Sequence, residues 1–71
     1  MRFLVVIEEG PESFGAYVPD LPGCIAVGTT REETLALMQE AIASHLEELR
    51  ARGQAIPAPS SSVETVEVAL A

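Results

Sequence analysis

The sequence predicts an α+β domain, a two-layer βββαβ sandwich in which one helix lies across a mostly antiparallel sheet. Short apolar runs separated by turn residues fill its first part, a pattern with helical spacing follows, and an alternating segment comes last. We expect one domain spanning residues 1–71. Its strands cover about residues 2–8, 13–18, 24–28 and 63–70, its helix about 31–52 and a flexible connector 54–62.

The run from Phe3 to Ile7 predicts the first strand. Its residues are apolar on both alternating faces, which is typical of a strand covered on both sides, so we expect it at the centre of the sheet. Turn residues then lead into a second run, so the two should form a hairpin. In that second run Tyr17 faces away from the expected inner residues, Phe14, Ala16 and Val18.

A compact corner is predicted by Pro19-Asp20-Leu21-Pro22-Gly23. The prolines fix φ, Asp20 can accept backbone hydrogen bonds, and Gly23 can adopt positive φ. The third strand begins at Cys24, and Gly28 ends it.

The helix has both a start and a stop signal. Thr30 and Glu33 have the spacing of a capping box, in which the Thr30 hydroxyl reaches the Glu33 amide and the Glu33 carboxylate reaches back. Gly53 is the expected left-handed cap at the other end. The apolar stripe expected to pack on the sheet contains Leu35, Met38, Ala41, Ile42, Leu46 and Leu49.

Alternation over residues 63–70 predicts a fourth strand that returns to the sheet, with Glu64, Val66, Val68 and Leu70 on one face. One helix covers only one sheet face. The opposite face would therefore carry apolar side chains of the first and fourth strands, and an exposed patch of this kind is typical of a protein interface.

Composition narrows the classes of partner. Eleven acidic residues against four basic ones give a net charge of −7, which repels phosphate backbones, so nucleic acid is not expected as a direct ligand. The charge favours a basic protein partner, although it can equally serve only to keep a small apolar domain in solution. A chain of 71 residues has a marginal core, so self-association or a partner is expected.

The cysteine content and the N-terminal run bear on the cell compartment. Cys24 is the only cysteine, so neither an intramolecular disulfide nor a zinc site of paired cysteines can form. The opening apolar run is too short for a membrane span and lacks a signal-peptide cleavage pattern. We therefore expect a cytoplasmic protein.

The run from Ala16 to Cys24, with Gly28-Thr29-Thr30 and a helix opening Glu32-Glu33-Thr34, resembles the HicB antitoxin family. The resemblance covers Phe3 to about Pro59. It implies a partial RNase H-like (HicB-like) fold and the neutralising half of a toxin–antitoxin pair. The implied partner is a HicA-like toxin, a small basic protein that cleaves messenger RNA and is blocked when the antitoxin covers its active surface. A homo-oligomer, dimer or tetramer, is implied as well.

Many members of that family continue into a C-terminal DNA-binding domain. This chain ends at Ala71, after the expected fourth strand, so we do not expect it to bind a promoter. No cofactor, metal or catalytic residue is expected. The residues expected to contact a partner are Tyr17, Asp20, Glu64, Val66 and Val68; those expected to shape the motif are Pro19, Asp20, Pro22, Gly23, Cys24, Thr30, Glu33 and Gly53.

Two other hypotheses remain open. One is an orphan scaffold module whose open sheet face only forms a homo-oligomer, with no toxin. The other is a metal-dependent nuclease, which needs carboxylates converging on two ions about 4 Å apart. Its candidate ligands are Glu8, Glu9, Glu12 and Asp20.

Three further features have a structural and a functional interpretation. His45 can ligate a metal, but as a residue beside the apolar stripe it fits a half-buried helix position. Cys24 can act as a nucleophile only beside a base, and a small core side chain is the alternative. The helix acids can meet a basic toxin or simply face solvent; they are Glu32, Glu33, Glu40, Glu47 and Glu48.

Overall fold

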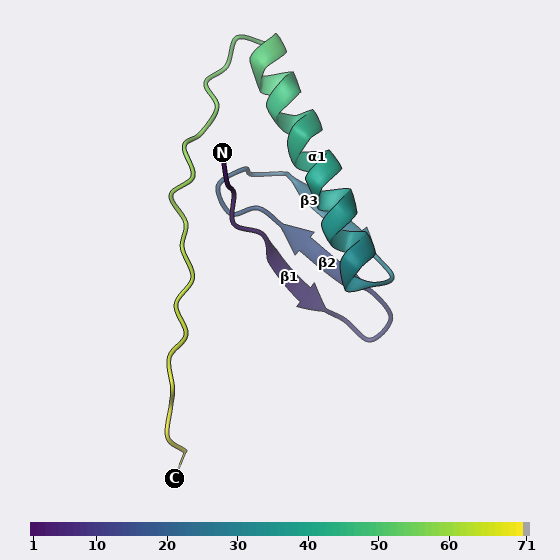
Figure 1. Cartoon of the computed structure of the whole chain (residues 1–71), viewed down its shortest axis with the longest axis vertical. Coiled ribbons are helices and arrows are strands. Elements are labelled where there is room, and N and C mark those ends of the chain that lie inside the picture. Colours follow the sequence, from purple (N-terminus) through teal and green to yellow (C-terminus); the bar gives the residue numbers. More distant parts are fainter. Residues whose placement is uncertain (71) are drawn as a thin grey trace.

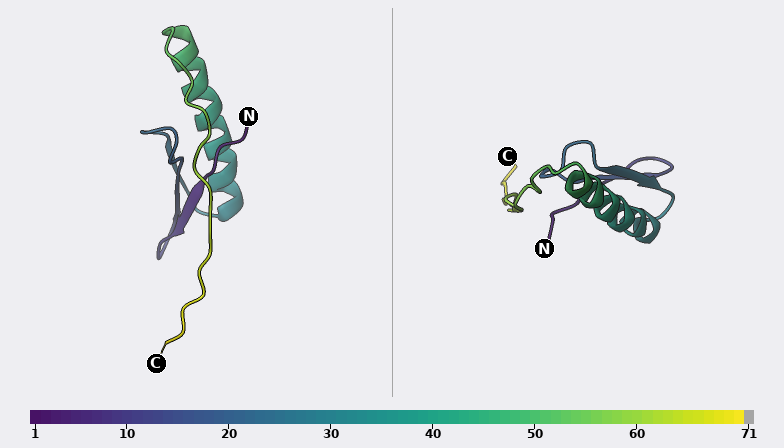
Figure 2. Two further views of the ribbon diagram at one scale, coloured as in Figure 1. Left: turned by 90° about the vertical axis from the view of Figure 1, so that its left-hand side faces the viewer. Right: turned by 90° about the horizontal axis from the view of Figure 1, so that it is seen from above.

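The computed structural model describes residues 1–70 and has two layers, a three-stranded sheet and one helix. The elements are β1 (Val6–Glu9), β2 (Phe14–Tyr17), β3 (Ile25–Gly28) and α1 (Arg31–Ala51). The strands are ordered β1-β2-β3 and both pairs are antiparallel. The helix crosses one face of this sheet, over β2 and β3 (Figures 1 and 2). The predicted α+β class is confirmed.

The strand register sorts the side chains between the two faces. Ile7 pairs with Ala16, which pairs with Ala26, and this row faces the helix. The next row, Val6, Tyr17 and Ile25, has the opposite parity and faces away from it. The predicted orientation of Tyr17 is therefore confirmed.

The corner after β2 places Leu21 in the centre of the core. The Leu21 amide donates to the Val18 carbonyl at 3.1 Å and the Cys24 amide donates to the Leu21 carbonyl at 3.1 Å, which folds the backbone inward. Gly23 has a φ of 85°, the positive value predicted for it. The buried core consists of Ala16, Val18, Leu21, Cys24 and Met38.

The helix begins with the predicted cap, with one change. The Glu33 amide donates to the Thr30 hydroxyl at 3.0 Å, as the capping box requires. The Glu33 carboxylate, however, accepts from the Thr29 amide at 2.7 Å. The Glu33 carboxylate therefore binds the amide of Thr29, one residue before the Thr30 amide that the standard capping box uses.

Gly28 is required where β3 meets the helix. A Cβ atom at this position would lie 2.6 Å from the Thr34 hydroxyl oxygen and 3.0 Å from the Thr34 amide nitrogen. Thr34 itself is fully buried, and its hydroxyl donates to the Thr30 carbonyl at 2.7 Å. Glycine therefore allows the end of β3 to approach the first turn of the helix.

The prediction of the apolar stripe is confirmed in the middle of the helix and is wrong at its start. Met38 is buried, and Ala41, Ile42 and Leu46 pack against the core, but Leu35 is exposed. The buried residue of the first turn is Thr34, one turn before Met38 on the same face. At the other end Gly53 has a φ of 68° and its amide donates to the Arg50 carbonyl at 3.0 Å, which confirms the left-handed cap.

The first strand is shorter than predicted and is not central. It was expected over residues 2–8 at the middle of the sheet, but β1 begins at Val6 and lies at the edge. The physical reason is the length of its neighbour: β2 ends at Tyr17, the partner of Val6, where the chain turns into the corner. Residues 2–5 therefore have no strand beside them in the part of the chain that the structure describes.

The fourth strand predicted over residues 63–70 does not form. Residues 54–70 have no regular structure, as expected for 54–62 alone, and leave the body of the domain as an exposed extended tail (Figure 1). An alternating sequence shows which faces of a segment can be covered, but a strand also needs a second strand that hydrogen-bonds to its backbone. Within residues 1–70 no strand pairs with the tail.

Within residues 1–70, no helix combines the length and the low polarity needed to cross a bilayer.

Candidate protein-binding surface

The sheet face opposite the helix carries an uncovered apolar surface, here called the outer face, formed by Val6, Tyr17, Ile25 and Val27. Val6, Tyr17 and Ile25 form one row across all three strands. Ile25 is 67% exposed and Val27 is 64% exposed, which is high for β-branched side chains in a sheet. Beside Val27, Gly15 contributes no side chain, and a Cβ there would meet nothing within 4 Å. A concentration of uncovered apolar side chains is what a docking partner buries.

The apolar outer face was expected to come from the first and fourth strands, and only the first contributes. Val6 of β1 lies on it, the fourth strand does not form, and the most exposed side chains, Ile25 and Val27, come from β3. Alternation within β3 was the available signal, because Ala26 and Gly28 face inward and the residues between them must face outward.

Asp20, at the corner after β2, holds the tail in place. Its carboxylate accepts hydrogen bonds from the backbone amides of Ser60 and Ser61, both at 3.0 Å. It also accepts from the two serine hydroxyls, at 3.1 Å and 2.8 Å. Asp20 therefore anchors a segment forty residues away, not only its own turn.

These hydrogen bonds change the acidity of Asp20. The backbone amide of Ser61, followed by that of Ser60, lowers the pKa of Asp20 from 3.8 to about 2, because both stabilise the charged form. The stability that these contacts contribute is therefore fully present above pH 3.8 and is lost as the pH falls through about 2.

We expect an NMR titration of the Asp20 carboxyl carbon to show this low midpoint. Replacing both Ser60 and Ser61 with alanine removes the two hydroxyl donors and should raise the midpoint only part of the way towards 3.8, because the backbone amides, which contribute most, remain. A wild-type midpoint for Asp20 near 3.8 would show that the tail is not anchored in solution.

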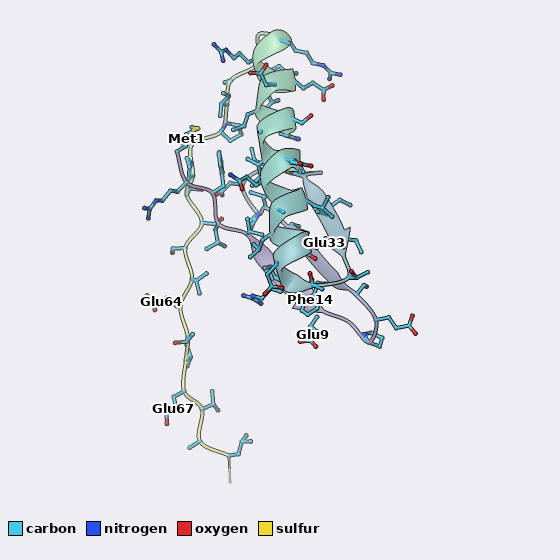
Figure 3. The ribbon with its side chains drawn as sticks, turned by 45° about the vertical axis from the view of Figure 1, so that its right-hand side comes forward. Met1, Glu9, Phe14, Glu33, Glu64 and Glu67 are labelled. Carbon is cyan, nitrogen blue, oxygen red and sulfur yellow. The ribbon has the colours of Figure 1, made fainter. Side chains whose placement is uncertain are left out.

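The structure separates the residues predicted to contact a partner into two groups. Tyr17 lies on the outer face and Asp20 at the corner, whereas Glu64, Val66 and Val68 lie along the exposed tail. Figure 3 shows Glu64 and Glu67 on the tail, away from Glu9 and Phe14 on the sheet and from Glu33 on the helix. Asp20 links the first group to the tail, through its hydrogen bonds with Ser60 and Ser61.

The helix presents acidic side chains to solvent. Near its C-terminus Arg52 pairs with Glu48 at 2.6 Å and Arg50 approaches Glu47 at 3.9 Å, and these pairs are exposed and contribute little stability. Glu32 and Glu40 are exposed and make no ion pair among residues 1–70.

The alternatives based on catalysis or metal binding gain no support from the geometry. Cys24 is buried, and burial raises the pKa of its thiol, which disfavours the nucleophilic thiolate. It is a small core residue, as the structural interpretation expected. No three His, Cys, Asp or Glu side chains of residues 1–70 are placed to hold a metal ion. His45 is half-buried on the helix, beside the stripe.

Comparison with known proteins gives a consistent result. Residues 3–69 match the family described as HicB-like antitoxin of bacterial toxin–antitoxin systems. A UPF0150 protein of Helicobacter pylori is 37% identical over the full length of both chains. Another UPF0150 protein, of Thermoplasma acidophilum, is 33% identical over 93% of this chain and 97% of its own.

Two further relatives carry names that refer to function. Antitoxin HicB 2 of Photorhabdus laumondii is 35% identical over 90% of this chain, which spans only 46% of that protein. Among solved structures, a chain of the HicA3 and HicB3 toxin–antitoxin complex superposes with a TM-score of 0.67 at 31% identity. That match covers 83% of this chain and 72% of the other.

Proposed function

Because the chain belongs to the HicB-like antitoxin family of bacterial toxin–antitoxin systems, we propose that it binds a HicA-like toxin and neutralises it by covering the toxin's RNA-binding surface. The solved relative belongs to a complex of HicA3 with HicB3, which supports a partner of this class.

The observation that carries the proposal is the uncovered outer face. Four apolar side chains from all three strands stand on the side of the sheet that the helix leaves bare. Tyr17 is suited to anchor a partner there, since its ring offers a large apolar area and its hydroxyl a polar tip. A toxin seated on this face would bury these side chains.

Charge supports a basic partner. The net charge of −7, with exposed carboxylates on the helix and the tail, attracts a cationic protein over long distances. Association with the toxin should therefore be faster at low salt, because screening shortens the range of this attraction.

We further propose that the protein acts by binding alone, without an enzymatic step, and in the cytoplasm, where a toxin that cleaves messenger RNA would act. Membership of an antitoxin family supports a role in binding, and the burial of Cys24 disfavours its use as a nucleophile.

The proposal is tested with a small basic protein, where one is encoded beside this gene, purified and titrated by calorimetry against wild-type protein, Ile25→Asp and Gln39→Asp. Ile25→Asp places a charge on the outer face, whereas Gln39→Asp places the same charge on the exposed side of the helix. We expect Ile25→Asp to weaken binding at least about tenfold, roughly 1.4 kcal/mol, and to reduce protection of RNA from the toxin. Gln39→Asp should bind like the wild type.

Equal binding by both variants would exclude the outer face. If the neighbouring protein does not bind at all, the orphan scaffold becomes the better interpretation. The exposed tail is the observation that favours self-association.

A further inference from the structure

We propose that residues 63–70 of one copy add as a strand to the free edge of β1 in a second copy, and that the exchange is reciprocal. The resulting dimer would give each sheet a fourth strand and place β1 inside it. This contact between copies is separate from the outer face that we assign to the toxin.

The tail has the properties of a strand that lacks its neighbour. Residues 63–70 alternate in character, and their backbone is extended but forms no ladder within residues 1–70. Val66 is 81% exposed, and Val63, Val68 and Leu70 are also exposed. When an extended segment with such exposed apolar side chains pairs with a sheet, the burial of these side chains is stabilising.

The free edge of β1 lacks a neighbouring strand in the same way. Phe3 and Val5 pack against the core, while Leu4 and Val6 are half-buried on the other side, so the segment is apolar on both faces although it lies at an edge. Sheet edges of monomeric proteins are usually guarded by charges, prolines or bulges. Residues 3–7 contain no charge and no proline, and the charges of the segment lie only at its two ends, at Arg2, Glu8 and Glu9.

The lengths of the two segments match. The tail strand covers eight residues, 63–70, and the extended N-terminal segment from Arg2 to Glu9 also covers eight. Each spans about 26 Å at the rise of a β-strand, about 3.3 Å per residue.

The anchor at Asp20 indicates why the strand partner is a second copy. Asp20 holds Ser60 and Ser61 at the corner, and Pro57 and Pro59 stiffen the segment before them. From this point the tail runs away from its own sheet and projects beyond the body of the domain (Figures 1 and 2). It is therefore presented outward, towards another molecule.

Each chain carries both the tail strand and the free edge. Two copies related by a twofold axis can therefore pair each tail with the edge of the other copy. The exchange also accounts for both departures from the sequence prediction. The first strand is apolar on both faces because it becomes internal, and residues 63–70 alternate because they become a strand.

The first test is sedimentation of the full chain, without toxin, over a range of concentrations. Val66→Pro removes a backbone donor from the middle of the tail strand and should weaken the dimer at least tenfold. Ala58→Pro is the matched control: it adds a proline between Pro57 and Pro59, outside the pairing segment, and should leave the dimer intact. A wild-type monomer at every concentration, or a Val66→Pro dimer of unchanged affinity, would overturn the proposal.

The second test locates the contact. Isotope-labelled and unlabelled copies are mixed, and filtered NMR spectra are recorded to detect only contacts between copies. Contacts between residues 63–70 of one copy and residues 2–8 of the other are expected in the filtered spectra. If these contacts appear only in an unfiltered spectrum of a uniformly labelled sample, the tail folds back on its own sheet and the proposal is overturned. Neither test involves the toxin, so a failure here leaves toxin binding to be judged by Ile25→Asp.

Discussion

Replacing Met38 with aspartate is expected to abolish folding. The Met38 side chain is 1% exposed, at the point where the helix packs on the sheet. Truncating a buried methionine already costs about 2–5 kcal/mol, and a carboxylate at this position would also be buried without a partner. A domain of this size has a total stability of only about 4–10 kcal/mol, so the substitution removes most or all of it.

Circular dichroism during heating measures this effect. We expect Met38→Asp to show no cooperative transition, while Gln39→Asp, the next helix position and exposed, melts close to the wild type. Cooperative melting of Met38→Asp near the wild-type temperature would mean that this helix face does not pack on the sheet.

Replacing Leu21 with alanine should be the second most damaging change. Leu21 has an exposed fraction of 0% although it lies in a turn, because the corner after β2 directs its side chain into the core. The cavity left by the substitution should cost about 2–5 kcal/mol. Urea unfolding would measure this loss as a lower midpoint with an unchanged slope.

Ile25→Ala is the control for Leu21→Ala, since it shortens a side chain that is already mostly in solvent. We expect it to cost no more than about 1 kcal/mol, the full span of strand propensity. Equal losses for the two variants would show that Leu21 is not a core residue in solution.

The two proposed interfaces use different parts of the sheet. The outer face presents side chains from one face of the sheet, whereas the exchange between copies uses the backbone edge of β1. The two are therefore compatible, and a dimer would carry two outer faces, one for each toxin.

Signals in the sequence were enough to predict the local structure. The cap at Thr30, the positive φ of Gly23 and Gly53 and the extent of the helix follow from contacts within a few residues, so their signals are complete in the local sequence. The alternation of β2 likewise fixed the direction of Tyr17. The acidic composition favoured a basic protein over nucleic acid, a preference that the proposed binding test examines.

Which strands have neighbours depends on how the whole chain folds. Alternation records which faces of a strand can be covered, but it does not record what covers them, so the sequence could not show that β1 lies at an edge or that residues 63–70 find no strand beside them in a single copy. The contact of Asp20 with Ser60 and Ser61 joins residues forty positions apart, and it depends on where the chain returns after the helix. Long-range proximity of this kind is a property of the folded backbone and leaves no periodic pattern in the sequence.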